Sequence, residues 1–326
     1  CESNNVQLYA SGTHVFDWAK VTSPGVSLGS IDTITISPTT STCYVLTGTD
    51  TITGCENKDT VCVVVNKRPT ADAGLDQSIC ETSTITLSAA SASNGSVIWT
   101  TSGNGTFDSD TIQNPVYTPG LNDPGNTITL TLTVSNSPCI DAVSTVDISV
   151  EQQPIANIDT ANPNPVCSGD TVNLSGTATY GTPLWTTGGN GLLKNPTSLT
   201  PYYISAITDV GIINIYLEVS GLIGECNAGI DTVKLDVKGI PTANAGINDT
   251  ICEGDIKLFA DATSSNGNIL WNTAGDGFFD DSTLVKTSYI HGTTDIGSTI
   301  WFTMTVSNSP CPTDEDTSLL KVDPAP

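Results

Sequence analysis

Apolar and polar residues alternate with a period of two along most of the chain. Clear examples are Leu130-Thr-Leu-Thr-Val134 and Thr145-Val-Asp-Ile-Ser-Val150, which are rich in β-branched side chains. Turn residues interrupt the alternation, among them four Asn-Gly pairs that begin at residues 94, 104, 190 and 266; such pairs are typical of tight turns with positive φ. Because successive side chains of a strand point to opposite faces, the pattern predicts an all-β chain whose strands bury one face.

One arrangement of cysteine, tryptophan and alternating segments occurs four times. The cysteine and the tryptophan that follows it are Cys1 and Trp18, Cys80 and Trp99, Cys167 and Trp185, and Cys252 and Trp271. Internal repeats of this kind indicate tandem domains, which we place at 1–67, 68–153, 154–239 and 240–326. The first domain does not contain the Pro-x-Ala segment that opens the other three, so we expect its first strand to be missing.

The tryptophan of each repeat falls on the third expected strand. About seven strands with a tryptophan at this place are typical of an immunoglobulin-like (Ig-like) β-sandwich. The predicted fold is therefore all-β, a tandem and elongated array of such sandwiches. We expect Trp18, Trp99, Trp185 and Trp271 to anchor the four cores; stacking of a sugar on them is the less favoured alternative.

The charge of the chain excludes several functional classes. There are 34 acidic and 10 basic residues, a net charge of −24, and Arg68 is the only arginine. Such a surface repels nucleic acid and anionic membranes, and no apolar run is long enough to insert into a membrane. The two histidines, His14 and His291, are far apart and are expected on the surface, and no phosphate-binding loop, CxxC or HExxH motif occurs. We therefore expect no enzyme.

Ten cysteines indicate disulfides and an oxidising compartment. Cys43 and Cys62 lie on the last two expected strands of the first domain, which form a hairpin, so they are predicted to form a cross-strand bond. For the repeat cysteines two schemes remain open. A constant spacing of 59 residues between the two cysteines in three of the repeats favours bonds inside domains: Cys1–Cys55, Cys80–Cys139, Cys167–Cys226 and Cys252–Cys311.

Strand topology favours the other scheme. Within one sandwich the two cysteines are expected at opposite poles, roughly 20–25 Å apart, whereas a disulfide needs Cα atoms within about 7 Å. In a head-to-tail array the pole of one domain meets the loop between the last two strands of the next. This geometry predicts bonds between domains, namely Cys1–Cys139, Cys80–Cys226 and Cys167–Cys311, with Cys55 and Cys252 left for other repeats.

Several segments together resemble a known family. They include Ala71-Asp-Ala-Gly with the following Ile79-Cys-Glu81, Gly103-Asn-Gly-Thr-Phe-Asp108 and Pro115-Val-Tyr-Thr-Pro119. This combination resembles the PKD-like and Ig-like repeats of large Bacteroidota surface adhesins, including gliding-motility adhesins exported by the type IX secretion system. The resemblance covers nearly the whole chain. It implies a secreted, cell-surface location and a stalk, filament or adhesin role in cell adhesion.

A short motif supports the same origin. Bacteroidota O-glycosylation sites resemble Asp followed by Ser or Thr and then by an apolar residue or Thr. Nine matches place the acceptor hydroxyl at Thr33, Thr51, Thr60, Thr111, Thr160, Thr171, Thr232, Thr250 and Ser282. The alternative is that Asp-Thr merely opens strands and was copied with the repeats. The motif predicts a glycoprotein with sugars at several of these positions.

Metal and ligand sites are weakly indicated. Asp276, Asp280 and Asp281 form an acidic loop that could hold Ca²⁺, but their spacing does not match a known calcium loop and a solvated turn is favoured. No other cofactor is expected.

We expect a structural stalk or filament segment whose partners are neighbouring repeats of one long polypeptide. Two alternatives stay open: accessory repeats of a secreted hydrolase, and a module binding glycans or cell-surface proteins. For the binding module, the fourth domain with Phe278, Phe279 and Trp301 is the best candidate, although Trp301 is expected to pack inside.

Overall fold

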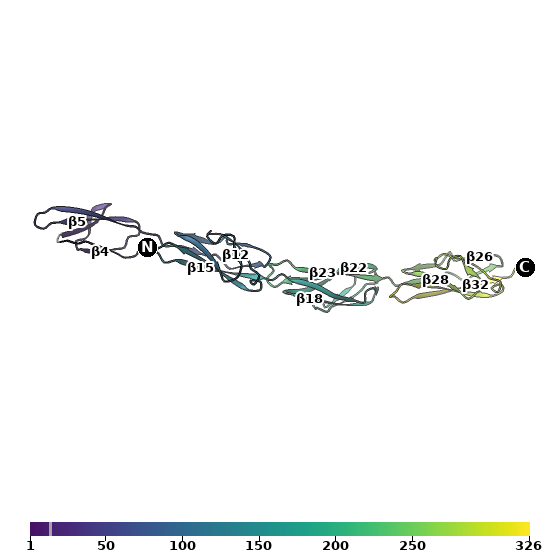
Figure 1. Cartoon of the computed structure of the whole chain (residues 1–326). Coiled ribbons are helices and arrows are strands. Elements are labelled where there is room, and N and C mark those ends of the chain that lie inside the picture. Colours follow the sequence, from purple (N-terminus) through teal and green to yellow (C-terminus); the bar gives the residue numbers. More distant parts are fainter. Residues whose placement is uncertain (13–14) are drawn as a thin grey trace. The chain divides into compact units, whose positions relative to one another are not determined.

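The computed structural model describes residues 1–12 and 15–326, and every regular element in them is a β-strand (Figure 1). His14 lies outside the described residues. The described chain contains no helix that could cross a membrane. It divides into two compact units, Cys1–Gln152 and Gln153–Pro326, which are treated separately below. The prediction of an all-β fold is confirmed.

The predicted domain 1, residues 1–67, forms two sheets. Its strands are β1 (Val6–Tyr9), β2 (Val15–Lys20), β3 (Ser23–Gly29), β4 (Thr33–Ile36), β5 (Thr42–Thr49) and β6 (Glu56–Val63). β1 pairs with β4, and the larger sheet has the order β3-β2-β5-β6. The last strand, β6, is therefore an edge strand, and nearly all of its residues are exposed.

The predicted domain 2, residues 68–153, lies in the first unit except for its last residue. Its strands are β7 (Thr70–Asp72), β8 (Gln77–Cys80), β9 (Ile85–Thr86), β10 (Ser91–Ser93), β11 (Ser96–Thr101), β12 (Thr106–Phe107), β13 (Val116–Thr118), β14 (Thr127–Ser135) and β15 (Ala142–Glu151). One layer is the sheet β11-β14-β15-β8, and the other consists of β12-β13-β9 and the pair β10-β7. The opening segment supplies strands to both layers, and β8 runs parallel to the last strand, β15.

Domain 3, residues 154–239, begins the second unit. Its strands are β16 (Ile155–Asn162), β17 (Val166–Cys167), β18 (Thr171–Thr179), β19 (Gly181–Thr187), β20 (Leu192–Lys194), β21 (Tyr202–Ile204), β22 (Gly211–Gly221) and β23 (Gly229–Lys238). They form the sheets β16-β18-β21-β20 and β17-β23-β22-β19. Again the opening segment contributes to both layers.

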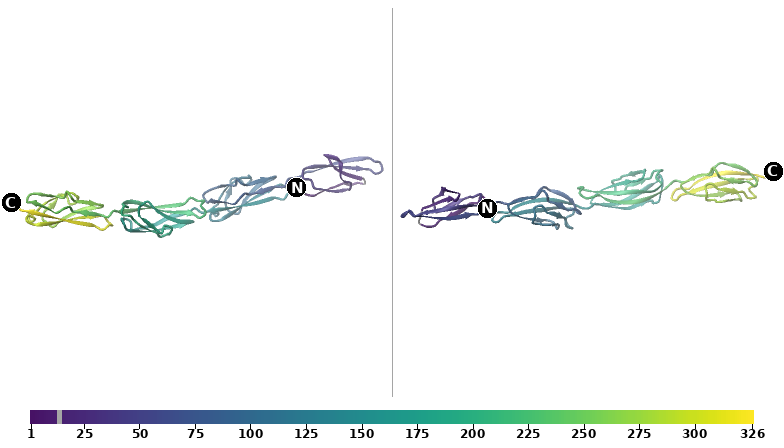
Figure 2. Two further views of the ribbon diagram at one scale, coloured as in Figure 1. Left: turned by 180° about the vertical axis from the view of Figure 1, so that it is seen from behind. Right: turned by 90° about the horizontal axis from the view of Figure 1, so that it is seen from above.

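Domain 4, residues 240–326, repeats the topology of domain 2. Its strands are β24 (Thr242–Asn244), β25 (Asp249–Cys252), β26 (Ile256–Leu258), β27 (Thr263–Ser265), β28 (Asn268–Thr273), β29 (Phe278–Phe279), β30 (Ser288–Ile290), β31 (Thr299–Ser307) and β32 (Asp314–Asp323). The sheets are β25-β32-β31-β28, β26-β30-β29 and β24-β27. Two further views show the paired layers of each sandwich (Figure 2).

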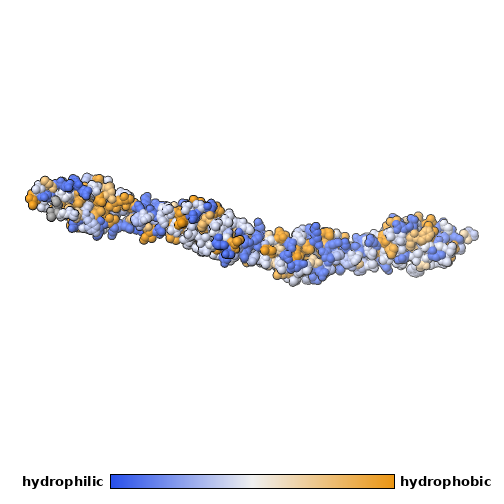
Figure 3. All heavy atoms as spheres, viewed as in Figure 1, coloured by the Kyte–Doolittle hydropathy of each residue, from blue (hydrophilic) through white to orange (hydrophobic). Residues whose placement is uncertain are grey.

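Each domain has its own hydrophobic core between its layers, and one tryptophan lies in every core. Trp18, Trp99, Trp185 and Trp271 are at most 2% exposed. Buried indole N–H groups usually find a partner: Trp185 Nε1 donates to the Ser198 carbonyl and Trp271 Nε1 to the Leu284 carbonyl, both at 3.0 Å. Trp99 Nε1 is buried without one among the described residues. Hydrophobic and hydrophilic residues are intermixed over the visible surface (Figure 3).

Two local expectations are wrong. Asn94 and Asn266 have positive φ, 58° and 54°, as expected for Asn-Gly turns, but Asn104 and Asn190 do not. These two belong to a different feature, described below. Trp301 does not pack inside: its side chain is 55% exposed, because it occupies an outward position of β31 opposite Leu319.

Candidate functional site

The junction between domains 1 and 2 is closed by a disulfide. Cys1, at the start of domain 1, bonds to Cys139, in the loop between β14 and β15, with an S–S distance of 2.06 Å and a Cα–Cα distance of 5.0 Å. The chain terminus that carries Cys1 accordingly lies beside domain 2 in both drawings of the first unit (Figure 1, Figure 2). The bond thus links one domain to a loop of the next.

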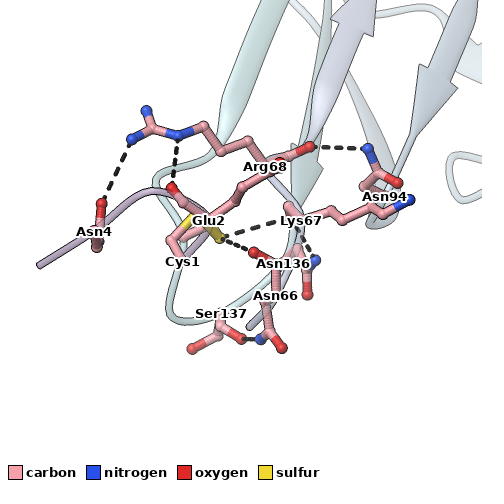
Figure 4. Close-up of a disulfide and its surroundings, with 10 residues drawn as sticks. Cys1, Glu2, Asn4, Asn66, Lys67, Arg68, Asn94, Asn136 and Ser137 are labelled. Atoms are coloured by element: carbon pink, nitrogen blue, oxygen red, sulfur yellow. Dashed lines mark hydrogen bonds between the residues drawn. A yellow bond between two sulfur atoms is a disulfide. The ribbon is translucent and has the colours of Figure 1, made fainter. Parts of the chain in front are cut away.

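Side-chain amides hold the linker at this junction (Figure 4). Asn136 Nδ2 donates to the Lys67 carbonyl at 2.9 Å, and Asn94 Nδ2 donates to the Arg68 carbonyl at 3.0 Å. The positive φ of Asn94 brings its amide to the linker. Linker carbonyls lie outside any sheet and need such donors, so domain 2 fixes the chain that leads into it.

Arg68 connects the linker back to domain 1. Its guanidinium donates to the Glu2 carbonyl and to Asn4 Oδ1, each at 3.4 Å, and the Glu2 N–H donates to the Asn66 carbonyl at 2.8 Å (Figure 4). The single arginine of the chain is therefore a junction residue. Together with the disulfide, these contacts join both domains to the same short linker.

The junction between domains 3 and 4 is built in the same way within the second unit. Cys167 bonds to Cys311, in the loop between β31 and β32, with a Cα–Cα distance of 5.0 Å. Asn308 Nδ2 donates to the Gly239 carbonyl at 2.8 Å, and Asn266 Nδ2 donates to the Ile240 carbonyl at 2.9 Å. Two asparagines and one disulfide are thus common to both junctions.

These bonds are incompatible with the alternative scheme of bonds inside domains. Cys1–Cys139 excludes Cys1–Cys55 and Cys80–Cys139, and Cys167–Cys311 excludes Cys167–Cys226 and Cys252–Cys311. The physical reason is that the two cysteines of one repeat lie at opposite poles of its sandwich. The pairing Cys80–Cys226 would join the two units and stays a prediction.

Of the other cysteines, two form a bond inside domain 1 and two are free. Cys43 and Cys62 face each other on β5 and β6 and are bonded, with a Cα–Cα distance of 3.9 Å. Cys55 and Cys252 are exposed free thiols. The Glu253 N–H donates to the Asp323 carbonyl at 2.8 Å, as Glu2 does to Asn66, so Cys252 has the same backbone setting as the bonded Cys1.

The sequence reasoning missed a buried tyrosine–aspartate pair. Three domains contain it: Tyr117 with Asp123, Tyr203 with Asp209, and Tyr289 with Asp295, with hydroxyl-to-Oδ2 distances of 2.7, 2.5 and 2.8 Å. The three carboxylates are at most 3% exposed. A Tyr-x5-Asp spacing was the available signal, but it also occurs in domain 1 as Tyr44 and Asp50, where Asp50 Oδ1 accepts the Ile52 N–H. Spacing alone therefore does not reveal the buried pair.

Backbone donors surround each of these carboxylates. Asp123 Oδ1 accepts the Asn104 N–H at 3.0 Å and Oδ2 accepts the Gly120 N–H at 2.8 Å. A Cβ on Gly103 would lie 2.3 Å from Asp123 Oδ1, and one on Gly105 would lie 2.4 Å from the Tyr117 hydroxyl. The segment Gly103–Gly105 thus packs closely against Tyr117 and Asp123. This packing explains why Asn104 forms no positive-φ turn.

The pairs shift the acid–base behaviour of both partners. Burial raises the pKa of Tyr117 and of Tyr289 to about 12. Burial alone would raise the pKa of the Asp123 carboxyl, but hydrogen bonds from the Gly120 N–H and the Tyr117 hydroxyl outweigh it and hold the pKa below its ordinary value. A neutral phenol and a charged carboxylate are thereby stabilised together.

In the acidic loop of domain 4, the carboxylates of Asp276 and Asp281 accept hydrogen bonds from neighbouring groups of the chain. Asp276 lies where domain 2 has Asn104, and its carboxylate accepts the Thr294 N–H at 3.1 Å, which lowers its pKa. Asp281 Oδ1 accepts hydrogen bonds from Thr283, while the Asp280 backbone N–H donates to Ser288. In the described ranges no cluster of three or more His, Cys, Asp or Glu residues has metal-binding geometry. His291 Nε2 accepts the Gly254 N–H at 2.9 Å.

Most of the predicted glycosylation hydroxyls are accessible. Seven of the nine residues are exposed, and only Thr33 and Ser282 are half-buried. The preceding aspartate also has a structural role at some of them, since Asp249 Oδ1 accepts the Thr250 N–H at 2.8 Å. Accessibility and the local role of the aspartate are therefore compatible with each other.

Two of the solved structures that match the chain cover nearly all of it. The N-terminal eight Ig domains of Down Syndrome Cell Adhesion Molecule match with a TM-score of 0.52 and 13% identity, over 98% of this chain and 47% of that chain. The insect immune protein hemolin matches at 12% identity over 98% of this chain and 96% of that chain, with a TM-score of 0.34.

The likeness to the first of these structures identifies tandem Ig-like β-sandwiches. The chain spans about half the length of that structure. No family model and no curated protein matches the chain.

Proposed function

We propose that the chain is a structural stalk segment of an extracellular, cell-surface adhesin. The observation that carries this proposal is the stapled junction, which occurs in both units as Cys1–Cys139 and Cys167–Cys311. Contacts between tandem domains usually leave them free to move relative to each other. A disulfide between successive domains, beside a linker held by two asparagines, restricts that motion and keeps the domains at a fixed separation.

Three further properties support a role at the cell surface. Disulfides persist in oxidising, extracellular compartments. The net charge of −24 favours solubility of an exposed, repetitive surface. The resemblance to Bacteroidota adhesin repeats, including those of gliding motility, adds a source and an export route through type IX secretion, and it carries the expectation of O-linked sugars.

Disulfide mapping and solution scattering test the stalk proposal. Mass spectrometry of the unreduced chain should yield a linked Cys80–Cys226 peptide in addition to the two junction bonds. Small-angle X-ray scattering should show a broader distribution of interatomic distances for a Cys1→Ala/Cys139→Ala variant. The matched control is Cys43→Ala/Cys62→Ala, which removes a bond inside one domain and should leave the distribution unchanged. Equal distributions for all three proteins would contradict the proposal.

A second candidate function is binding of a glycan or protein by domain 4. On its outer sheet β26-β30-β29, Ile256 lies opposite Ile290, which lies opposite Phe278. Phe278 is 61% exposed, whereas domain 2 has Thr106 opposite Thr118 at the corresponding place. An apolar cross-strand row on an exposed sheet is a feature of ligand-binding faces.

A glycan array probed with the full chain tests this candidate. A Phe278→Thr variant should lose the bound glycans, while Trp301→Thr, which changes an exposed aromatic residue of another sheet, should retain them. An array on which both variants bind as the unmodified chain does would contradict the candidate.

A further inference from the structure

In three of the four domains, one of the hydrogen bonds between the opening segment and the last strand recurs at the same position. The Ala73 N–H donates to Ser144 Oγ at 3.0 Å, the Ile158 N–H to Asp231 Oδ2 at 2.7 Å and the Ala245 N–H to Asp316 Oδ2 at 2.8 Å. Each acceptor lies directly opposite a fully buried residue of the preceding strand, namely Leu132, Leu217 or Met304. The position of the acceptor in the sheet is therefore the same in all three.

Domain 1 carries an acceptor at this position. In the pairing of β5 with β6, Asp59 lies opposite Leu46, as Ser144 lies opposite Leu132. Asp59 is exposed, and its Oδ1 accepts the N–H of the adjacent Thr60 at 2.8 Å. A carboxylate can accept several hydrogen bonds, so Asp59 retains the capacity to hold an opening strand.

A groove lies beside Asp59 where the opening segment runs in the sister domains. It has a volume of about 350 Å³ and is lined by Leu8, Trp18, Leu46, Asp59 and Val61, among others. Val61 is 41% exposed, whereas Val146, two residues after Ser144 as Val61 is after Asp59, is 1% exposed. Apolar surface that the opening segment covers in domain 2 is therefore exposed in this groove of domain 1.

The edge of the sheet differs farther along the last strand, four to seven residues beyond the acceptor. The last strands of domains 2, 3 and 4 pair in parallel with β8, β17 and β25, whereas β6 of domain 1 is the outermost strand of its sheet. An open strand edge beside an apolar groove is the arrangement that accepts an added strand.

We propose that this groove of domain 1 binds an extended polypeptide segment of the opening-strand type, with small apolar residues at alternate positions. The sister domains define its chemistry, since Ala73 and Ala245 are at most 2% exposed at the corresponding place. The opening strands β7, β16 and β24 are all paired within their own domains, so none of them is the donor in the folded chain. The inference does not depend on the stalk role.

Fluorescence anisotropy with a labelled peptide tests the proposal on the full chain. The probe has the sequence of residues 69–79, Pro-Thr-Ala-Asp-Ala-Gly-Leu-Asp-Gln-Ser-Ile. We expect saturable binding with one peptide per chain. N-methylation of the alanine that corresponds to Ala73 removes the donated N–H and should weaken binding by about tenfold, the scale of a hydrogen bond to a charged group.

The variant Asp59→Ala separates this contact from general stickiness. The variant should bind the unmodified peptide about tenfold more weakly than the unmodified chain does. It should bind the methylated and unmodified peptides with equal affinity, because the contact is already lost. Asp32→Ala, an exposed carboxylate elsewhere in domain 1, is the matched control and should bind like the unmodified chain. Absence of saturable binding, or a methylation effect that persists undiminished in Asp59→Ala, would overturn the proposal.

Discussion

Tyr289 and Asp295 are joined by a buried hydrogen bond of 2.8 Å from the tyrosine hydroxyl to Oδ2. The loop that contains Asp295 is thereby tied to β30, and the backbone N–H groups of Asp276 and Gly292 donate to the same carboxylate. The equivalent pairs in domains 2 and 3 have the same partners, so this arrangement is a structural constant of three domains.

Removing the hydroxyl should destabilise its domain. We expect Tyr289→Phe to lower the free energy of unfolding of domain 4 by about 1.5–3 kcal/mol, the range for hydrogen bonds to charged groups. Native-state hydrogen exchange of amides in β30 and β31 measures this. Tyr180→Phe, at a 49% exposed position, is the control and should change nothing; equal protection in both variants would refute the role of the pair.

Alkaline pH should destabilise the chain through the same tyrosines. The pKa of Tyr117 and Tyr289 is raised to about 12 in the folded state from an ordinary value of 10.0. The stability linked to this shift is fully present below pH 10 and is lost as pH rises toward about 12. A titration of tyrosinate absorbance should show late-titrating groups that include Tyr117 and Tyr289, because burial raises the pKa of Tyr44 and Tyr203 as well. Tyr117→Phe should remove one late group.

Acid should also lower the stability of the chain, through the buried Asp123 and Asp209, whose pKa is lowered instead of raised. The pKa of Asp209 is held below its ordinary value of 3.8: burial acts to raise it, but hydrogen bonds from the Tyr203 hydroxyl and the Asn190 N–H prevail. The stability is therefore present above pH 3.8 and is lost as pH falls through the folded-state pKa. Thermal unfolding between pH 7 and 3 should show a smaller acid shift for Asp209→Asn; an identical shift would contradict this linkage.

The hairpin disulfide of domain 1 should contribute measurably to its stability. Cys43 and Cys62 are 19 residues apart, and closing a loop of that length corresponds to about 3 kcal/mol in the chain-entropy description. Urea unfolding of Cys43→Ala/Cys62→Ala should show this loss in domain 1. Cys55→Ser changes an exposed free thiol and should unfold like the unmodified chain.

The predicted sugars can be checked by mass. Peptides that contain Thr111, Thr160 or Thr250 should carry hexose mass shifts when the chain is isolated from its native source, because all three residues are exposed. Peptides around the half-buried Thr33 should be modified less. Unmodified peptides at all three exposed positions would contradict the motif.

Sequence periodicity was sufficient to predict the fold. Alternation in segments such as Leu130-Thr-Leu-Thr-Val134 reflects one buried and one exposed face, and β14 has this pattern. Periodicity failed where outward positions carry large apolar residues: Trp301 occupies a solvent-facing position of β31. The alternation of apolar and polar residues predicts which face of a strand is buried only where the outward positions carry polar residues.

The candidate sites depended more strongly on tertiary contacts. The spacing of the repeat cysteines allowed two disulfide schemes, and the loop position of Cys139 next to Cys1 distinguishes them. Asn104 and Asn94 look alike in sequence, because both precede glycine. Only packing separates them: Asn104 lies over a buried carboxylate, and Asn94 reaches a linker carbonyl.

By itself, the sequence determined the strands, their repetition and the tryptophan of each core, because these follow from local alternation and from copying of one domain. The folded chain decided which cysteines meet, which aspartates are buried and where Asp59 stands beside an uncovered groove. Those features join residues that are between six and more than a hundred positions apart, and their proximity is set by strand register and by the packing of one layer on another.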